Sequence, residues 1–431
     1  MDLFTASRRL SRAFAVDGGP LPIHQHAIIG DGYSCALVGT DGSIPWLCLP
    51  QFDSPSVFAA ILDQQNGGTF RVAPSTTGKT GGESRQAYDD STNVLQTLFQ
   101  QDGSAMVVTD FMPWMGEQHS SLHELHRLLE MREGAMEVEV VFDPRFDYGR
   151  GETRVHTTPH GAQADGPNGE VLSVSISPGL RFEPRPQGGV VARFPMPRGK
   201  RTWVILSWGS NPEPTAAHRP FEHLRRTRRF WRSWAARISY DGPWRHDVLR
   251  SALTLKLLQF VPTGGMVAAP TTSLPVCPGG RRNWDYRFSW TRDSAMAIRS
   301  MNLIGYADEA LGFFRFVRDC VDRRGKLDLM VSIDGQDTAS EEVLTHLAGH
   351  DGSGSVRIGN AASRQVQHDI IGPLLDAVSL YEKTGGILSL RLWREIRHLV
   401  DKAVAAIDIP DHGIWEPRSQ PSHHVHSKLM T

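Results

Sequence analysis

The spacing of apolar residues changes once along this chain of 431 residues, close to Trp244. Before that point, short runs rich in Val, Phe and Trp alternate with clusters of Gly, Pro, Asn and Asp, which is typical of antiparallel sandwiches. After it, apolar residues recur at the three- and four-residue spacing of amphipathic helices. The sequence therefore predicts a β region followed by an α region, and the length indicates two or three domains.

The expected strands of the first half have the length and the β-branched or aromatic composition of half-buried strands. Asp102 and Gly103 separate two of them and predict a tight hairpin. The clearest runs are 94–99, 105–111, 136–142, 171–176, 190–194 and 202–208.

The second half carries apolar stripes at helical spacing, in 248–257, 307–321, 370–381 and 392–403. Two Gly-rich stretches between them, 263–289 and 324–362, are longer than ordinary loops and favour a functional interpretation. We predict an N-terminal extension, a β domain, a helical linker and a helical catalytic domain, spanning 1–19, 20–219, 220–243 and 244–431.

The charge balance argues against a polyanionic partner. Lys and Arg number 46 and Asp and Glu 47, which gives a net charge of -1. One basic run could contact nucleic acid, but we interpret it as the solvated face of the linker helix; it comprises Arg225, Arg226, Arg228 and Arg229.

Several features predict a soluble cytoplasmic protein without a membrane partner. The N-terminus lacks the apolar core of a secretory signal, and no stretch reaches the roughly 20 apolar residues of a membrane span. The four cysteines form no CxxC pair and are expected to be reduced. His423, His424 and His426 lack accompanying ligands at metal-site spacing, so neither a metal nor a cofactor is expected.

One loop before an expected helix, 276–296, mixes aromatic rings with charged groups. Aromatic faces can cover a pyranose ring, while carboxylates and guanidinium groups bind its hydroxyls, so this mixture suits a sugar. A helix start capped by Thr291, with Asp293 in the first turn, explains part of the pattern equally well. The residues concerned are Trp284, Asp285, Tyr286, Arg287, Phe288, Trp290, Arg292 and Asp293.

A second candidate is Glu416, which follows Trp415. A carboxyl group beside an indole can be desolvated, which raises its pKa and keeps it protonated for donation to a glycosidic oxygen. A solvent-facing glutamate near a helix end is the commoner explanation of such a dipeptide. Pro417 is expected to restrict Glu416 to an extended backbone.

A third candidate combines Glu341 and Glu342 with the glycine-rich loop 346–362. Glycines let backbone amides approach a ligand closely. The spacing of a phosphate-binding loop is not present there, and a structural loop is the better interpretation.

Taken in order, several segments resemble the glycoside hydrolase family of glucoamylases, glucodextranases and bacterial trehalases, family 15. The resemblance starts at about residue 20 and covers nearly the whole chain. It is carried by IGDGYSCALVGTDGSIPWLCLPQFDSPSVFAAILD (29–63), DFMPW (110–114), VVFDPRFDYGR (140–150), PTTSLP (270–275), GGRRNWDYRFSWTRDSA (279–295), HLAGHDGSGSVRIGNAASRQVQHD (346–369) and GIWEPR (413–418).

This resemblance implies an antiparallel β-supersandwich followed by an (α/α)6 barrel, here incomplete. Arg292 and Asp293 would bind the hydroxyls of a terminal glucose, and Glu416 would be the general acid. Trp415 and the loop residues Trp284, Asp285 and Arg287 would face the sugar with less defined roles.

The implied activity is inverting hydrolysis of α-glucosidic bonds with release of glucose from non-reducing ends, as in glucoamylases. Trehalase activity is the nearest alternative, and neither the sequence nor the resemblance chooses between maltooligosaccharides, dextran and trehalose. In the family the general base lies well downstream of the segment matching Glu416, so we expect this chain to lack it. A catalytically impaired remnant that only binds or regulates is the alternative of another class. A homo-oligomer or a complementing chain would cover the open barrel.

Overall fold

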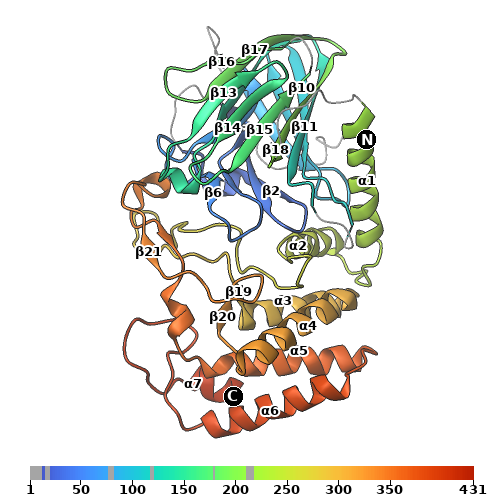
Figure 1. Cartoon of the computed structure of the whole chain (residues 1–431). Coiled ribbons are helices and arrows are strands. Elements are labelled where there is room, and N and C mark those ends of the chain that lie inside the picture. Colours follow the sequence, from blue (N-terminus) through green and yellow to red (C-terminus); the bar gives the residue numbers. More distant parts are fainter. Residues whose placement is uncertain (1–11, 15–19, 76–81, 117–120, 178–179, 210–217) are drawn as a thin grey trace. The chain divides into compact units, whose positions relative to one another are not determined.

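The computed structural model describes residues 12–14, 20–75, 82–116, 121–177, 180–209 and 218–431 (Figure 1). These residues form two compact units. Unit 1 comprises 1–235, 274–282 and 345–356, and unit 2 comprises 236–273, 283–344 and 357–431. The two short segments of unit 1 fall inside the domain predicted from 244 to 431, whose boundaries otherwise stay a prediction.

Unit 1 is built on antiparallel sheets, and within the described residues the largest has nine strands. Neighbouring strands along the chain, such as β9 and β10, pair with one another, whereas β18 returns to lie between β11 and β15. Its order is β1 (Arg12–Phe14), β8 (Gly82–Tyr88), β9 (Leu95–Gln101), β10 (Ser104–Phe111), β11 (Glu124–Glu133), β18 (Arg201–Trp208), β15 (Val171–Ile176), β14 (Gly161–Asp165) and β13 (Arg154–Thr158).

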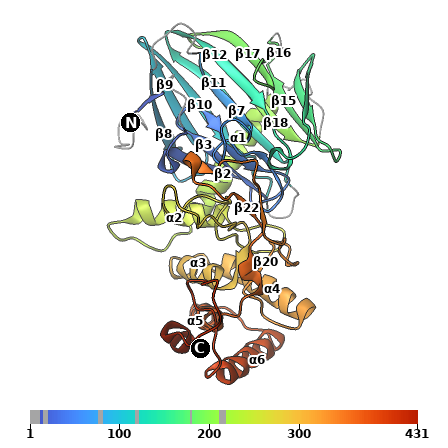
Figure 2. The same cartoon turned by 90° about the vertical axis from the view of Figure 1, so that its left-hand side faces the viewer.

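Two smaller antiparallel sheets complete the β part of unit 1 (Figure 2). Apolar side chains from all three sheets form one buried cluster, which includes Phe58, Phe70, Phe99, Phe142 and Phe194. The sheets therefore pack as layers around a single core, as the alternating pattern predicts. The first has the strand order β16 (Glu183–Pro184), β17 (Val190–Pro197), β12 (Ala135–Asp143), β7 (Thr69–Pro74) and β4 (Ser43–Ile44). The second has the order β2 (His26–Gly30), β3 (Cys35–Gly39), β5 (Trp46–Cys48) and β6 (Ser56–Phe58).

A buried ion pair lies inside this core. Arg127 of β11 donates from Nε to Oδ1 of Asp110 at 2.8 Å and from Nη2 to Oδ2 at 3.1 Å. Both side chains are fully buried, and the guanidinium carbon lies 5.2 Å from the centroid of the Phe70 ring. The bidentate geometry satisfies both carboxylate oxygens, which is what allows two charges to remain inside an apolar core.

Removing one partner of that pair is expected to destabilise unit 1 strongly. Asp110→Ala leaves the Arg127 guanidinium buried without its counter-charge, which lowers the free energy of unfolding by about 3–5 kcal/mol. Glu152→Ala, which removes the solvent-exposed pair with Arg154, serves as the control and should change it far less. Denaturant unfolding followed by tryptophan fluorescence compares the two, and equal effects would contradict the expectation.

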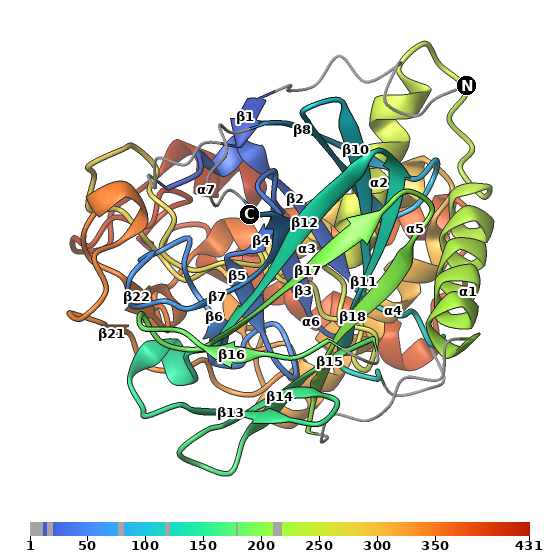
Figure 3. The same ribbon diagram turned by 90° about the horizontal axis from the view of Figure 1, so that it is seen from above.

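Helix α1 (His218–Ala235) packs along the nine-stranded sheet beside β11 and β18, as Figures 1 and 3 both show. Leu224 of the helix joins Leu128 and Trp203 of these strands in a second buried cluster. The Thr227 hydroxyl accepts a hydrogen bond from the Trp114 amide at 3.0 Å. The helix was predicted as part of a linker over 220–243; in the structure it forms part of unit 1.

Unit 2 is mainly helical. Helix α3 packs on both α4 and α5, and α5 packs on α6 and α7. Long stretches without regular helix precede α3, α5 and α7. The helices are α2 (Arg245–Leu257), α3 (Thr291–Leu303), α4 (Ala307–Arg324), α5 (Ile371–Lys383), α6 (Leu390–Ala406) and α7 (Val425–Met430), with strand pairs β19 (Ser289–Trp290) and β20 (Met330–Val331), β21 (Glu342–Val343) and β22 (Arg357–Ile358).

Helix α6 carries apolar residues on more than one face. Ile396, Leu399, Ala403 and Ala406 are buried against the rest of unit 2. Other apolar side chains of the helix and its flanks remain exposed: Leu390, Trp393, Val400, Val404, Ile407 and Ile409. Among the described residues, no helix combines the length and the apolar composition needed to cross a bilayer.

Candidate active site

The candidate residues of unit 2 come from three stretches, one that runs into the first turn of a helix and two that precede a helix. Trp284 to Asp293 lead into α3, Gln367 and Asp369 lie directly before α5, and Glu416 lies before α7. Asp293 lies in the first turn of α3, as predicted. The N-cap of this helix is Trp290, however, and not Thr291. The Thr291 hydroxyl instead donates to the carbonyl of Asp328 at 2.8 Å.

The carboxyl group of Glu416 lies against an indole, but this indole belongs to Trp290. Nε1 of Trp290 donates a hydrogen bond to Oε1 of Glu416 at 3.2 Å. Burial raises the pKa of the Glu416 carboxyl, and the charge of Asp293 acts in the same direction. The hydrogen bond from Trp290 opposes this effect without cancelling it. A carboxyl group with a raised pKa is suited to donating a proton.

Two local expectations about Glu416 need correction. Its φ angle is 53°, in the left-handed region, whereas Pro417 predicts an extended backbone. The tight turn explains this, since the amide of Glu416 donates to the carbonyl of Gly413. Trp415 is 91% exposed, so it is not the indole that desolvates the carboxyl group. Its predicted contact with a sugar stays a prediction.

Arg292 connects the three stretches of the site. Its Nη1 donates to Oε1 of Gln367 at 2.7 Å and to Oδ2 of Asp369 at 3.2 Å. Its Nη2 lies 3.9 Å from Oε1 of Glu416. Asp369 is fully buried, so the guanidinium is held rigidly with one edge turned towards the Glu416 carboxyl group.

Asp293 follows in the first turn of α3, and its Oδ2 lies 3.7 Å from Nε of Arg292. Desolvation raises the pKa of its carboxyl group, although 48% of the side chain stays exposed. The nearby Tyr286 has a raised pKa, for which burial is the first cause and the charges of Glu416 and Asp293 are the others. Asp293, Glu416 and Tyr286 therefore influence one another electrostatically.

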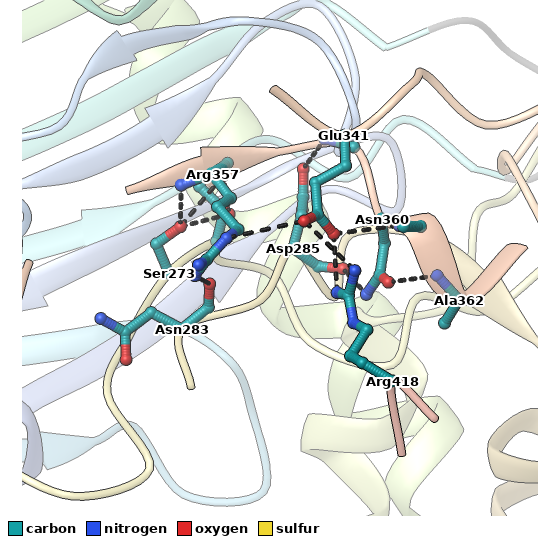
Figure 4. A network of polar contacts seen from close by, with 11 residues as sticks. Ser273, Asn283, Asp285, Glu341, Arg357, Asn360, Ala362 and Arg418 are labelled. Atoms are coloured by element: carbon teal, nitrogen blue, oxygen red, sulfur yellow. Dashed lines mark hydrogen bonds and ion pairs between the residues drawn. The ribbon is translucent and has the colours of Figure 1, made fainter. Parts of the chain in front are cut away.

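Asp285 and Arg287 are both buried and bind each other. Arg287 donates from Nε to Oδ1 of Asp285 at 2.9 Å and from Nη2 to Oδ2 at 2.7 Å. Oδ2 also accepts from the amide of Gly359, and the Asp285 carbonyl accepts from Nδ2 of Asn360 (Figure 4). In the structure this pair holds the loop in place, and its predicted contact with a sugar stays a prediction.

Glu341 is surrounded by donors (Figure 4). Arg418 donates from Nη2 to its Oε2 at 2.8 Å, the amide of Ala361 donates to the same oxygen at 3.0 Å, and Nε of Arg357 lies 3.6 Å from Oε1. Burial alone would raise the pKa of Glu341, but these hydrogen bonds and charges lower it. A carboxylate with its oxygens engaged in this way is poorly placed to activate water.

Trp284 lies next to the same two arginines. The guanidinium carbon of Arg418 is 4.3 Å from the centroid of its ring, and that of Arg357 is 4.6 Å away. These cation–π contacts fix the indole and join the segment of Glu416 to the loop before α3, because Arg418 follows Glu416 by two residues.

Sequence reasoning alone did not single out Gln367 and Asp369 as individual site residues. Both belong to the segment 346–369, but no local pattern distinguishes them from ordinary polar residues. Their partner Arg292 is more than seventy residues away in the chain, which only the folded structure reveals. The four cysteines are free, and the described residues place no metal-type cluster at His423, His424 and His426.

The chain is similar to several proteins named trehalase. It is 36% identical over 398 residues to the trehalase of Thermoplasma acidophilum, which covers 92% of this chain and 67% of the relative. It is 36% identical to the trehalase of Thermoplasma volcanium, over 96% of this chain and 66% of that relative. It is 35% identical to the trehalase of Mycolicibacterium smegmatis, over 95% of this chain and 64% of that relative. The chain thus spans about two thirds of the length of these relatives.

A bacterial glucoamylase complexed with acarbose has a similar fold, with a TM-score of 0.62 at 13% identity, covering 95% of this chain and 63% of that one. This supports the order of a sheet-rich region and a helical region. Residues 10–220 match the family model of the trehalase-like N-terminal region, and residues 242–431 match that of glycosyl hydrolases family 15. The sequence identity to these relatives and the two family-model matches place the chain in glycoside hydrolase family 15.

Proposed function

We propose that this chain carries the acid half of an active site that hydrolyses α-glucosidic bonds with inversion. The proposal rests on the environment of Glu416. Its carboxyl group accepts a hydrogen bond from Nε1 of Trp290 at 3.2 Å, and burial raises its pKa. A carboxyl group that stays protonated can donate its proton to the glycosidic oxygen as the bond to the anomeric carbon breaks.

The neighbours of Glu416 support binding of a terminal glucose. Arg292 is fixed by Gln367 and Asp369, and Asp293 adjoins it with an exposed carboxylate edge. A guanidinium and a carboxylate side by side can bind adjacent sugar hydroxyls through charge-assisted hydrogen bonds. Such contacts would orient the anomeric carbon relative to Glu416. Trp290 and Tyr286 are the aromatic residues beside this group, and contacts of Trp284 and Trp415 with the sugar are part of the proposal.

Inversion needs a second carboxylate, about 6.5–9.5 Å from the acid, that takes a proton from the attacking water. Glu341 is held by arginines and Asp369 is buried beneath Arg292, so neither is suited to this role. We propose that the base is supplied by a segment outside these 431 residues, either in the same polypeptide or in another chain. The exposed apolar residues of α6 would pack against that segment.

Trehalose is the first substrate to test, because the relatives at 30–36% identity are named trehalases. Hydrolysis of glucose from the non-reducing ends of α-glucans is the second candidate, supported by the fold that the chain shares with a bacterial glucoamylase. Both substrates present a terminal α-glucose, so the Arg292 and Asp293 pair suits either.

A coupled assay of glucose release from trehalose and from maltotetraose tests the proposal. If the base lies outside these 431 residues, their turnover should be about 10²- to 10⁴-fold below that of one of the longer trehalase relatives. Sodium formate, a small external carboxylate, should raise it. Full turnover without formate would place a base within this chain. Sugar binding without turnover, even with formate, would favour a binding or regulatory role instead.

The pKa of Glu416 gives the activity a defined pH dependence. Only the protonated carboxyl group can donate, so activity falls as the pH rises through its raised pKa. The hydrogen bond from Trp290 stabilises the charged form, and Trp290→Phe removes it. The alkaline limb of the pH–rate profile should therefore move to higher pH. Trp393→Phe, at an exposed indole of α6, is the control, and a shift of the limb to lower pH in Trp290→Phe would contradict the assignment.

A further inference from the structure

A group of metal-ligand side chains lies in unit 1, far along the sequence from Glu416. Glu124, His126 and His223 each offer a ligand atom, and these atoms all lie within 4.8 Å of one another. Nε2 of His126 and Oε2 of Glu124 are 2.8 Å apart. No local sequence motif predicts the group, because two of its residues lie on β11 and the third lies almost a hundred residues later on α1.

The strand and the helix bring these side chains together for simple reasons of geometry. Glu124 and His126 are two residues apart in β11 and therefore point to the same side of the sheet. That side faces α1, since Leu128, the next residue in the same row, packs with Leu224 of the helix. His223 precedes Leu224 and reaches the same space, where its ring centroid is 5.4 Å from that of His126.

Both imidazoles have unused nitrogen atoms. Nδ1 of His126 and Nδ1 of His223 are buried and have no hydrogen-bond partner among the described residues. His126 is completely buried. Buried polar atoms without partners are uncommon, and a bound ion is one of the standard explanations.

The protonation state of the group suits a cation. Burial lowers the pKa of His126, and burial followed by the charge of its neighbours lowers that of His223 to about 4. A lowered pKa favours the neutral imidazole, which is the form that coordinates metals. Burial would raise the pKa of Glu124, but its hydrogen bond with His126 and the pairing with Arg219 lower it, so it is ionised.

Arg219 fixes the carboxylate from the other side. Its Nη2 donates to Oε1 of Glu124 at 2.8 Å, while Oε2 faces His126. Carboxylates that ligate metals are commonly held by such an outer hydrogen bond. The Arg219 side chain is 42% exposed and His223 is half-buried, which leaves a route from solvent to the group.

We propose that Glu124, His126 and His223 bind a divalent cation of the zinc class, which links α1 to β11. Two imidazoles and one carboxylate are a ligand set typical of zinc, with a water molecule completing four-coordination. Bond lengths of about 2.0–2.2 Å bring the ligand atoms to about 3.4 Å from one another, so small side-chain rotations are sufficient. The ion would stabilise unit 1 and takes no part in the proposed hydrolysis.

The test uses the full chain, stripped with a chelator and then titrated with zinc chloride or with cobalt chloride as a spectroscopic probe. We expect one ion to bind per chain and zinc to raise the midpoint of thermal unfolding. Bound cobalt should show the visible absorption bands of a four-coordinate ion. Losing a residue that only hydrogen-bonds to a metal ligand weakens metal binding by about 10- to 100-fold. His223→Ala and His223→Gln remove a ligand itself and should weaken zinc binding by more than that. His156→Ala, at an exposed histidine, should behave like the unchanged chain.

Two results would overturn this site. One is binding that is unaffected by either His223 variant but lost when His423 and His424 are replaced by Ala, which would place the ion at the later histidines. The other is no binding of zinc or cobalt to the unchanged chain at micromolar concentrations. The cobalt spectrum reports ligation directly, so it separates loss of the site from a general loss of stability in the variants.

Discussion

Glu416→Gln is expected to lower the rate of glucose release from an O-linked α-glucoside by about 10²- to 10⁴-fold. Glutamine keeps the size of the side chain and still accepts the hydrogen bond from Nε1 of Trp290, but it has no proton to donate. The loss should appear in kcat rather than in the affinity for sugar, because protonation of the leaving oxygen occurs only during the reaction.

A matched control for this change is Glu382→Gln. Glu382 lies exposed on α5, and its replacement should leave both rate and stability unchanged. Thermal unfolding of both variants checks that the folded state is retained. A Glu416→Gln variant that is folded and as active as the unchanged chain would remove Glu416 from the role of acid.

Arg292→Ala is expected to damage both the stability of unit 2 and its affinity for sugar. The change leaves Asp369 fully buried without its counter-charge, and truncating one member of a buried pair lowers the free energy of unfolding by about 3–5 kcal/mol. It also frees Gln367, the other group that positions the guanidinium. Weaker binding of a glucose-like inhibitor would follow from the loss of the charged donor.

The same helix offers a control for Arg292. Arg299 of α3 forms a partly exposed ion pair with Asp376, and Arg299→Ala should change stability by no more than about 1 kcal/mol. Denaturant unfolding measures both variants, and calorimetric titration with an iminosugar measures binding. Equal stability and equal binding in the two variants would contradict the proposed role of Arg292.

Local sequence patterns predicted much of unit 1. The predicted runs 94–99 and 105–111 correspond to β9 (Leu95–Gln101) and β10 (Ser104–Phe111). The hairpin between them is confirmed, with Asp102 and Gly103 at φ angles of 50° and 74°. Such features depend on alternation and on turn chemistry within a few residues, so they can be read from the sequence.

The helical stripes were predictable for the same reason. The stripe 307–321 falls within α4, and 392–403 falls within α6. How these helices pack, and whether they form part of an (α/α)6 barrel, depends on contacts that no local pattern encodes. The barrel therefore stays an expectation from the family resemblance.

The environment of the candidate acid could not be predicted locally. The indole that contacts Glu416 is that of Trp290, 126 residues earlier, whereas its neighbour Trp415 projects into solvent. The positive φ of Glu416 overrides the extended preference that Pro417 imposes. In both cases tertiary contacts and a tight turn decide the geometry.

The most direct test of the account compares the unchanged chain with Glu416→Gln on trehalose and on α-glucosyl fluoride, both with formate. Fluoride leaves without needing a proton, whereas the glycosidic oxygen of trehalose needs one. We expect the variant to lose about 10²- to 10⁴-fold in rate on trehalose and far less on the fluoride. Equal losses on the two substrates, or no loss on trehalose, would contradict the assignment of Glu416 as the general acid.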